Sequence, residues 1–178
     1  MEKELKQFED FLRKITENFK NEISGIRTNR PSPKLVEDIK VDYFDQKMTV
    51  KQLGSIAIVP PREININIWD KRAVGPVAKA IEVSGLGLSS NIDGNLIRVN
   101  LPQLTDERRQ ELAKLIKSLA ENSRIKIRSS RDDTNKKAKA LPDEDNKFKS
   151  MKKIQDLVDK YNKEIENSLS AKVQEINS

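Results

Sequence analysis

The segment 117–139 places basic side chains along one side of a predicted helix. At 100° per residue, five Lys and Arg side chains fall within an arc of about 80°. They are Lys117, Arg124, Arg128, Arg131 and Lys139. Arginine suits phosphate because its planar guanidinium stays charged and can donate two parallel hydrogen bonds. An anionic partner explains this alignment about as well as a solvated helix face carrying Glu–Lys pairs does.

Other kinds of site chemistry find little support in the chain. It contains neither Cys nor His, which excludes disulfides, thiolate nucleophiles, zinc sites and imidazole acid–base catalysis. The Gly-Leu-Gly at 85–87 follows a helix rather than a strand, so it is not a phosphate-binding loop. Lys147 occupies a ligand position of the calcium-loop pattern that begins at Asp143. We therefore expect a protein that is not an enzyme and has no catalytic residues, metal or cofactor.

Composition predicts an elongated, helix-rich protein. The 178 residues are 35% hydrophobic and 35% charged, with a formal net charge of +6. Mild basicity favours nucleic acid or an anionic membrane surface as the partner. No apolar run reaches the roughly 18 residues of a membrane span, and the N-terminus lacks the apolar region of a signal peptide. A cytoplasmic protein follows.

Three long amphipathic helices are predicted from apolar residues spaced three and four apart. The first runs from about Glu2 to Thr28, where the prolines at 31 and 33 end it. The second begins after Thr105, a good N-cap, and lasts until Leu141. Its apolar arc, from Leu112 through Leu115, Ile116 and Ile127, is expected about 100–140° from the basic side chains. The third helix follows residues 142–146.

Residues between the first two helices change to a period of two, which indicates half-buried strands. Alternating apolar residues predict strands around 39–43, 64–68 and 97–101, and 55–59 is a further candidate. A short helix is expected over 73–83, with a glycine stop at Gly85 or Gly87. Residues 91–94 are interpreted as a turn. Trp69, the only tryptophan, is expected to cover the second face of the small sheet, although it could stack on a base.

The predicted fold class is α+β: an elongated antiparallel three-helix bundle with a small β/α/β domain inserted between helices 1 and 2. The bundle is expected to comprise 1–29 plus 104–178, and the inserted domain 30–103. The chain passes between the two predicted domains twice, and both of these crossings carry a proline. The first crossing is at Arg30–Pro31 and the second at Leu101–Pro102, and together they are expected to form a hinge. Its expected residues are Arg30, Pro31, Leu101, Pro102 and Gln103.

The net charge belongs mainly to the predicted bundle. Residues 31–102 hold 9 Lys and Arg against 8 Asp and Glu, which leaves 25 basic and 20 acidic residues for the rest of the chain. Three further arginines need no anionic ligand. Arg27 is explained by compensation of the helix dipole at a C-terminus, and Arg109 is interpreted, with Arg108, as structural or domain-facing.

Several stretches together resemble the ribosome recycling factor family. They are GIRTNRPSPKL, ININIWDK, VAKAIEVSGLGL, DGNLIRVNLPQLTDERRQEL and RIKIRSSRDDTNKKAK, and they run through most of the chain from Ile23 to Lys139. The combination is highly specific, whereas any one stretch alone is moderate support. The joint departs from the usual family pattern because Asn29 stands in place of Gly and Pro31 in place of Ala. Asp132 stands where a basic residue is common, and the connection before the third helix looks short.

The resemblance implies an L-shaped molecule with a tRNA-like outline that binds the ribosome after termination. With elongation factor G and its GTP hydrolysis, such a factor splits the ribosome so that the subunits are reused. It further implies that the bundle lies on large-subunit rRNA and that Arg131 is an rRNA contact, with Arg128 beside it. A monomer without membrane contact is expected. The alternative is a helical RNA-binding or protein-interaction adaptor without recycling activity, which would need no GTPase.

Overall fold

The computed structural model describes all residues from Met1 to Ser178 and separates into two compact units. The helical unit comprises Met1–Ile23 and Gln110–Gln174. The small unit comprises Ser24–Arg109 together with the last residues, Glu175–Ser178. The predicted α+β class is confirmed, since long packed helices accompany a small β-sheet. The domain limits 1–29 plus 104–178 and 30–103 stay a prediction.

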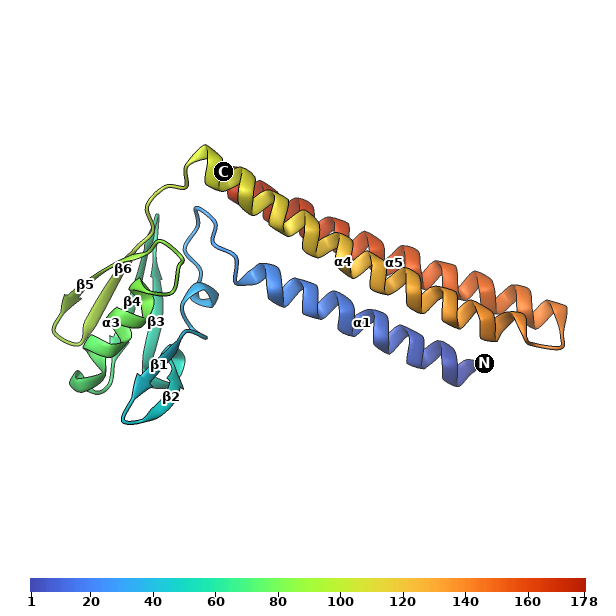
Figure 1. The fold of residues 1–178 in the computed structure, drawn as a ribbon, viewed down its shortest axis with the longest axis horizontal. Helices are drawn as coiled ribbons and strands as arrows, with labels where there is room; N and C mark the ends of the chain where they lie inside the picture. Colours follow the sequence, from blue (N-terminus) through green and yellow to red (C-terminus); the bar gives the residue numbers. More distant parts are fainter. The chain divides into compact units, whose positions relative to one another are not determined.

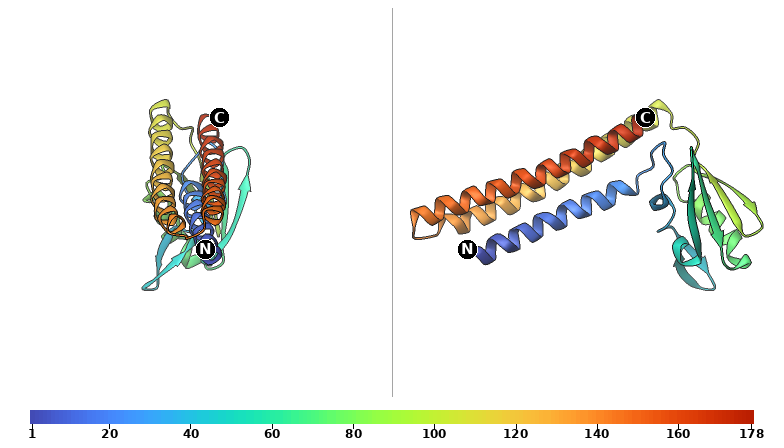
Figure 2. Two further views of the ribbon diagram at one scale, coloured as in Figure 1. Left: turned by 90° about the vertical axis from the view of Figure 1, so that its right-hand side faces the viewer. Right: turned by 180° about the vertical axis from the view of Figure 1, so that it is seen from behind.

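The helical unit consists of three long helices that lie side by side (Figures 1 and 2). These are α1 (Glu2–Ser24), α4 (Asp106–Lys139) and α5 (Glu144–Asn177). The N-terminus of α1 and the turn between α4 and α5 lie at the same end, so α4 runs antiparallel to the other two. None of the helices combines the length and apolar character that a membrane-spanning segment needs.

Each helix buries one narrow apolar stripe against the other two. On α1 the fully covered side chains include Phe8, Leu12 and Phe19, and on α5 they include Ile154 and Ile165. Single amphipathic helices of this kind are marginal in water, so mutual burial of the stripes is what keeps them folded. Ion pairs from Lys20 to Glu164 (2.9 Å) and from Lys160 to Glu9 (3.5 Å) join α1 to α5 at the rim.

Side chains at the helix ends set where α4 begins and where α1 stops. The Arg108 backbone N–H donates to the Thr105 hydroxyl at 3.2 Å, which confirms Thr105 as the N-cap of α4. Helix α1 was expected to reach Thr28 but ends at Ser24. Beyond it, the Arg30 N–H donates to the Thr28 hydroxyl at 3.2 Å, a local bond that competes with helical pairing.

The buried stripe of α4 is rotated from its predicted position toward the basic side chains. Leu115 was expected inside but is 47% exposed, whereas Ala120 and Ala138 are completely buried. Alanines offer little bulk, so a neighbouring helix can approach most closely on that side. Arg124 and Arg131 consequently border the buried stripe, and the two faces of α4 adjoin instead of lying well apart.

The small unit contains a four-stranded antiparallel sheet in the order β3-β4-β6-β5. Its strands are β3 (Gly54–Val59), β4 (Glu63–Ile68), β5 (Ser89–Asp93) and β6 (Leu96–Asn100). A separate hairpin pairs β1 (Lys40–Tyr43) with β2 (Gln46–Thr49). Helix α3 (Val74–Glu82) packs against β1, β5 and β6, and a four-residue helix α2 (Val50–Leu53) links β2 to β3.

One core fills the small unit, and it lies on a single face of the sheet. Ile64, Ile66 and Ile68 of β4 alternate inward and are at most 1% exposed, beside Ile97 and Val99 of β6. Helix α3 adds Val77 and Ile81 to the same cluster. The period-two pattern thus identified the inward-facing residues of these two strands correctly.

Three sequence interpretations of the small unit were wrong. Residues 91–93 were interpreted as part of a turn but belong to β5, whose mostly exposed polar residues give no apolar alternation. Strand β2 was missed for the same reason. Trp69 was expected to be packed but is 67% exposed, because it follows the buried Ile68 and alternation places it opposite the buried face.

Replacing glycine by alanine is expected to have opposite effects on stability at two positions of the small unit. A Cβ on Gly54 would lie 2.4 Å from the Asn67 carbonyl oxygen on the paired strand, whereas a Cβ on Gly75 in α3 would meet nothing within 4 Å. We expect Gly54→Ala to lower the free energy of unfolding by about 1–3 kcal/mol through overpacking. Gly75→Ala should raise it by roughly 0.5–1 kcal/mol through helix propensity. Urea unfolding measures both, and equal effects of the two substitutions would contradict this packing.

Candidate nucleic-acid interface

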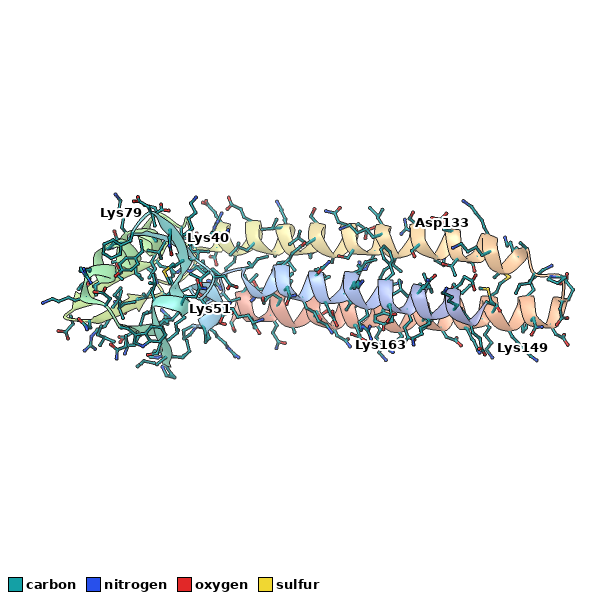
Figure 3. All side chains as sticks on the ribbon, turned by 90° about the horizontal axis from the view of Figure 1, so that it is seen from below. Lys40, Lys51, Lys79, Asp133, Lys149 and Lys163 are labelled. Atoms are coloured by element: carbon teal, nitrogen blue, oxygen red, sulfur yellow. The ribbon has the colours of Figure 1, made fainter.

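All five predicted cationic contacts project from α4 within the helical unit. Lys117, Arg128 and Lys139 are exposed, whereas Arg124 and Arg131 are partly buried beside the helix seam. Figure 3 shows side chains along the outside of the bundle, with Asp133 on the outer side of α4. We call these five residues the α4 basic face. The structure therefore brings the predicted residues together on one side of one rigid helix.

The Arg124 guanidinium is engaged within the protein. It forms an ion pair with the Glu166 carboxylate of α5 and lies 3.7 Å from Glu121 on its own helix. Only 31% of its side chain is exposed. Arg124 thus contributes to α4–α5 packing, and its charge is partly neutralised before any ligand arrives.

Arg131 is held by its sequence neighbour. Its Nε and Nη2 atoms donate to Oδ1 of Asp132 at 3.1 and 2.8 Å, and 33% of its side chain is exposed. This contact fixes the direction of the guanidinium along the helix surface. It also places a carboxylate beside the arginine that the family resemblance implies as an rRNA contact.

The remaining members of the face are freer. Arg128 is 61% exposed and reaches Glu121 only at 3.9 Å. Lys117 and Lys139 are exposed and form no ion pair. The sequence pattern suggested a helix face with positive charges alone. The structure differs, because Glu121 lies among the cations and forms ion pairs with Arg124 and Arg128. A phosphate could displace these exposed, weak ion pairs at small cost.

Arg27 has a role that the sequence interpretation missed. It lies beyond the end of α1 at Ser24, so compensation of the helix dipole does not explain it. Its guanidinium donates to the carbonyl oxygens of Leu86 (2.8 Å), Gly87 (3.0 Å) and Pro102. Burial, with a smaller contribution from the Arg108 charge, lowers the pKa of Arg27 below its ordinary value. One side chain therefore links both chain crossings to the loop that follows α3.

Asn29, noted as a departure from the family pattern, makes a second link of this kind. Its Oδ1 accepts from the Leu104 N–H at 3.2 Å, and its Nδ2 donates to the Ile176 carbonyl at 3.4 Å. A glycine here could make neither bond. The first crossing is thus tied to the second crossing and to the last turn of α5 through a single amide.

The predicted hinge residues lie among these contacts in the small unit. Leu101 is buried, and its N–H donates to the Arg62 carbonyl at 2.9 Å, which extends the sheet by one bond. Pro102 supplies a carbonyl to Arg27, and Arg30 turns back onto Thr28. Pro31 is partly buried and Gln103 is exposed. No pattern in the sequence indicated the linking roles of Arg27 and Asn29, because their partners are backbone groups, which every residue carries.

We expect Arg27→Lys to loosen the crossings, since one ammonium cannot reproduce the planar guanidinium contact with three carbonyls. Leaving such acceptors without a donor costs about 1–3 kcal/mol. Amide hydrogen exchange of residues 85–104 should speed up accordingly. Arg13→Lys is the matched control, because Arg13 forms only an exposed ion pair with Asp10. Unchanged exchange in Arg27→Lys would contradict the linking role.

Comparison with known proteins shows which protein family this chain is similar to. Residues 19–176 match the model of the family described as "Ribosome recycling factor". The ribosome-recycling factor of Aquifex aeolicus (strain VF5) is 41% identical over 175 residues, covering 97% of this chain and 95% of that protein. The corresponding protein of Hydrogenobaculum sp. is 38% identical over 174 residues, with the same shares covered.

Solved structures agree with the sequence comparisons. A solution structure of a ribosome recycling factor has a TM-score of 0.81 at 40% identity, covering 99% of this chain and 96% of that one. A second structure is described as models for the T. thermophilus ribosome recycling factor and E. coli elongation factor G bound to the E. coli post-termination complex. Its recycling factor has a TM-score of 0.70 at 28% identity. That comparison covers 99% of this chain and 98% of the other.

Proposed function

Because this chain belongs to the ribosome recycling factor family, we propose that it binds the post-termination ribosome and, with elongation factor G and GTP, separates the subunits for reuse. The family match over nearly the whole chain is the observation that carries this proposal. The adaptor alternative has no comparable support. The proposal places the protein in the cytoplasm as a monomer, where ribosomes end translation.

The α4 basic face is the part of the chain proposed to lie on large-subunit rRNA. Arg128, Lys117 and Lys139 are exposed, and the residues outside 31–102 carry 25 basic against 20 acidic groups. Neutralising phosphates releases counterions, so binding through such a face weakens steeply as salt increases. Arg131 would exchange Asp132 for a phosphate oxygen, with its guanidinium already directed along the helix.

The chain itself is proposed to contribute binding and mechanical movement, not catalysis. The sequence contains no GxxxxGK[ST] loop for a nucleotide triphosphate, so the energy would come from the GTPase partner. The joint for movement is proposed at Arg30, Pro31, Leu101, Pro102 and Gln103. With the bundle held on rRNA, a push on the small unit would disrupt contacts between the ribosomal subunits.

The direct test is the loss of light scattering when post-termination ribosomes are mixed with this protein, elongation factor G and GTP. We expect rapid loss only when all three are present. Tight binding to bare RNA without loss of scattering would instead favour the adaptor alternative.

Arg131→Ala should reduce splitting at limiting protein by about tenfold, because one phosphate contact is lost. The slope of log affinity against log salt should fall in magnitude by about 1. Arg13→Ala is the matched control, since it removes the same charge from an exposed site on α1. Equal effects of the two substitutions would indicate a general charge effect and sink the assigned role of Arg131.

Asp132→Asn should strengthen ribosome binding by about threefold, within the range expected for an exposed ion pair. The substitution frees the Arg131 guanidinium and removes a negative charge beside the proposed phosphate. Asp133→Asn changes net charge equally but lies on the outer side of α4, where Asp133 pairs with Lys136 at 3.3 Å. Affinities of the two variants, measured at several salt concentrations, separate local contact from net charge. A stronger gain for Asp133→Asn would contradict the orientation proposed for α4.

A further inference from the structure

The turn between β1 and β2 holds an aromatic residue in a backbone conformation that disfavours it. Tyr43 pairs with Gln46, so Phe44 and Asp45 form a two-residue hairpin turn. Their φ angles are 48° and 59°, which is the left-handed region. Such turns prefer Asn and Gly, because a bulky side chain crowds the following carbonyl. Phe44 is therefore costly at this position for the fold itself.

Burial does not compensate for that cost. The Phe44 side chain is 66% exposed, among the most exposed large hydrophobic residues of the chain. It lies outside the buried cluster of the small unit. Backbone strain that the fold does not reward tends to be kept where a residue serves recognition.

Side-chain contacts nevertheless hold the Phe44 ring in a defined orientation. The Tyr43 ring meets it edge-on, with centroids 4.5 Å apart and an interplanar angle of 71°. The Arg72 guanidinium lies 5.3 Å from the centroid of Phe44, in cation–π geometry. The exposed ring is thus fixed before any partner binds, which reduces the entropy lost on binding.

A carboxylate joins the two supports of the ring. Asp70 accepts from the Tyr43 hydroxyl, from the Arg72 N–H at 3.0 Å and from Arg72 Nε at 3.3 Å. The hydrogen bond from Tyr43, followed by those from Arg72, lowers the pKa of Asp70 to about 2. Asp70 therefore stays ionised at any pH at which ribosomes work, and both supports remain in place.

The local charge indicates a protein partner instead of RNA. Segments 42–47 and 69–72 contain three acidic and three basic residues, so this surface has no net charge. Surfaces that bind nucleic acid are expected to be strongly basic. Exposed aromatic residues beside an arginine are the types that dominate protein–protein binding energy.

We propose that Phe44, supported by Tyr43 and Arg72, inserts into an apolar pocket of elongation factor G. This assignment rests on the proposed function, and it identifies the point of the small unit on which the GTPase acts. We choose the GTPase as the partner because it accompanies the T. thermophilus factor in the post-termination complex. The anionic rRNA is instead the proposed partner of the α4 basic face.

The first test compares Phe44→Asn with Phe148→Asn. Asparagine tolerates the left-handed conformation, so we expect Phe44→Asn to unfold at or above the temperature of the parent protein. The concentration of elongation factor G that gives half-maximal splitting should rise about tenfold or more. Phe148 is 73% exposed on α5 and outside the proposed surface, so its substitution should leave that concentration unchanged.

The outcomes separate this proposal from the proposed function. If the parent splits ribosomes and Phe44→Asn needs no more elongation factor G, the surface is wrong and the function stands. If Phe148→Asn is impaired as strongly as Phe44→Asn, the effect is not specific to the turn and the surface is again wrong. A parent protein that never splits ribosomes overturns the function and this assignment together.

The second test identifies the partner molecule that contacts Phe44. A photoreactive p-benzoylphenylalanine at position 44 is irradiated with purified ribosomes, elongation factor G and a non-hydrolysable GTP analogue. We expect an adduct with elongation factor G that resists ribonuclease and is identified by mass. An adduct with rRNA, with a ribosomal protein or with a second copy of this chain would overturn the assignment, and so would the absence of any adduct.

Discussion

Mutual burial of three narrow apolar stripes is the constraint on which the helical unit depends. None of α1, α4 and α5 has a wide apolar face, so each needs both neighbours to be stable. This requirement fixes the rotation of α4 about its own axis. Complete burial of Ala120 and Ala138 leaves Lys117, Arg128 and Lys139 in solvent. The direction of the basic face is therefore a consequence of core packing.

The same rotation explains why Arg124 and Arg131 are more restrained than the other three cations of the α4 basic face. Arg124 and Arg131 border the buried stripe, so their long side chains cover apolar surface and keep their charged ends at its rim. Both then meet carboxylates, Glu166 across the helix pair and Asp132 along the helix. Restraint of this kind costs some attraction for phosphate but spares the side-chain entropy that a free arginine would lose on binding.

Periodicity predicted the elements whose residues alternate between core and solvent, and failed where no alternation exists. The three helices, β4 and β6 followed directly from spacings of three, four and two. Strands β2 and β5 have few buried side chains, so only hydrogen bonding to their neighbours reveals them. The exposure of Trp69 depends on whether a second layer covers the sheet, which is a property of the tertiary fold.

Some candidate site residues could be predicted from periodicity, and others could not. The α4 basic face could be predicted because helical geometry alone brings residues three and four apart together. The contacts of Arg27 and Asn29 could not, since their partners are backbone groups distant in the sequence. Phe44 was hidden for a related reason, because only the register of β1 with β2 places it at a left-handed turn position. Backbone groups brought together by the fold thus supplied the candidate site residues that residue types alone did not reveal.

Charge and strain give the two units different kinds of binding surface. A basic helix face attracts any polyanion over several ångströms, and salt screens that attraction. A rigid aromatic ring on an electrically neutral hairpin attracts nothing at a distance and gains free energy only when a complementary pocket removes it from water. In the proposed function, the first surface would hold the factor on the ribosome, whereas the second would distinguish one protein partner from another. A factor that must stay bound while a GTPase engages it needs both, because two attractions of the same electrostatic kind would weaken together whenever the ionic strength rises.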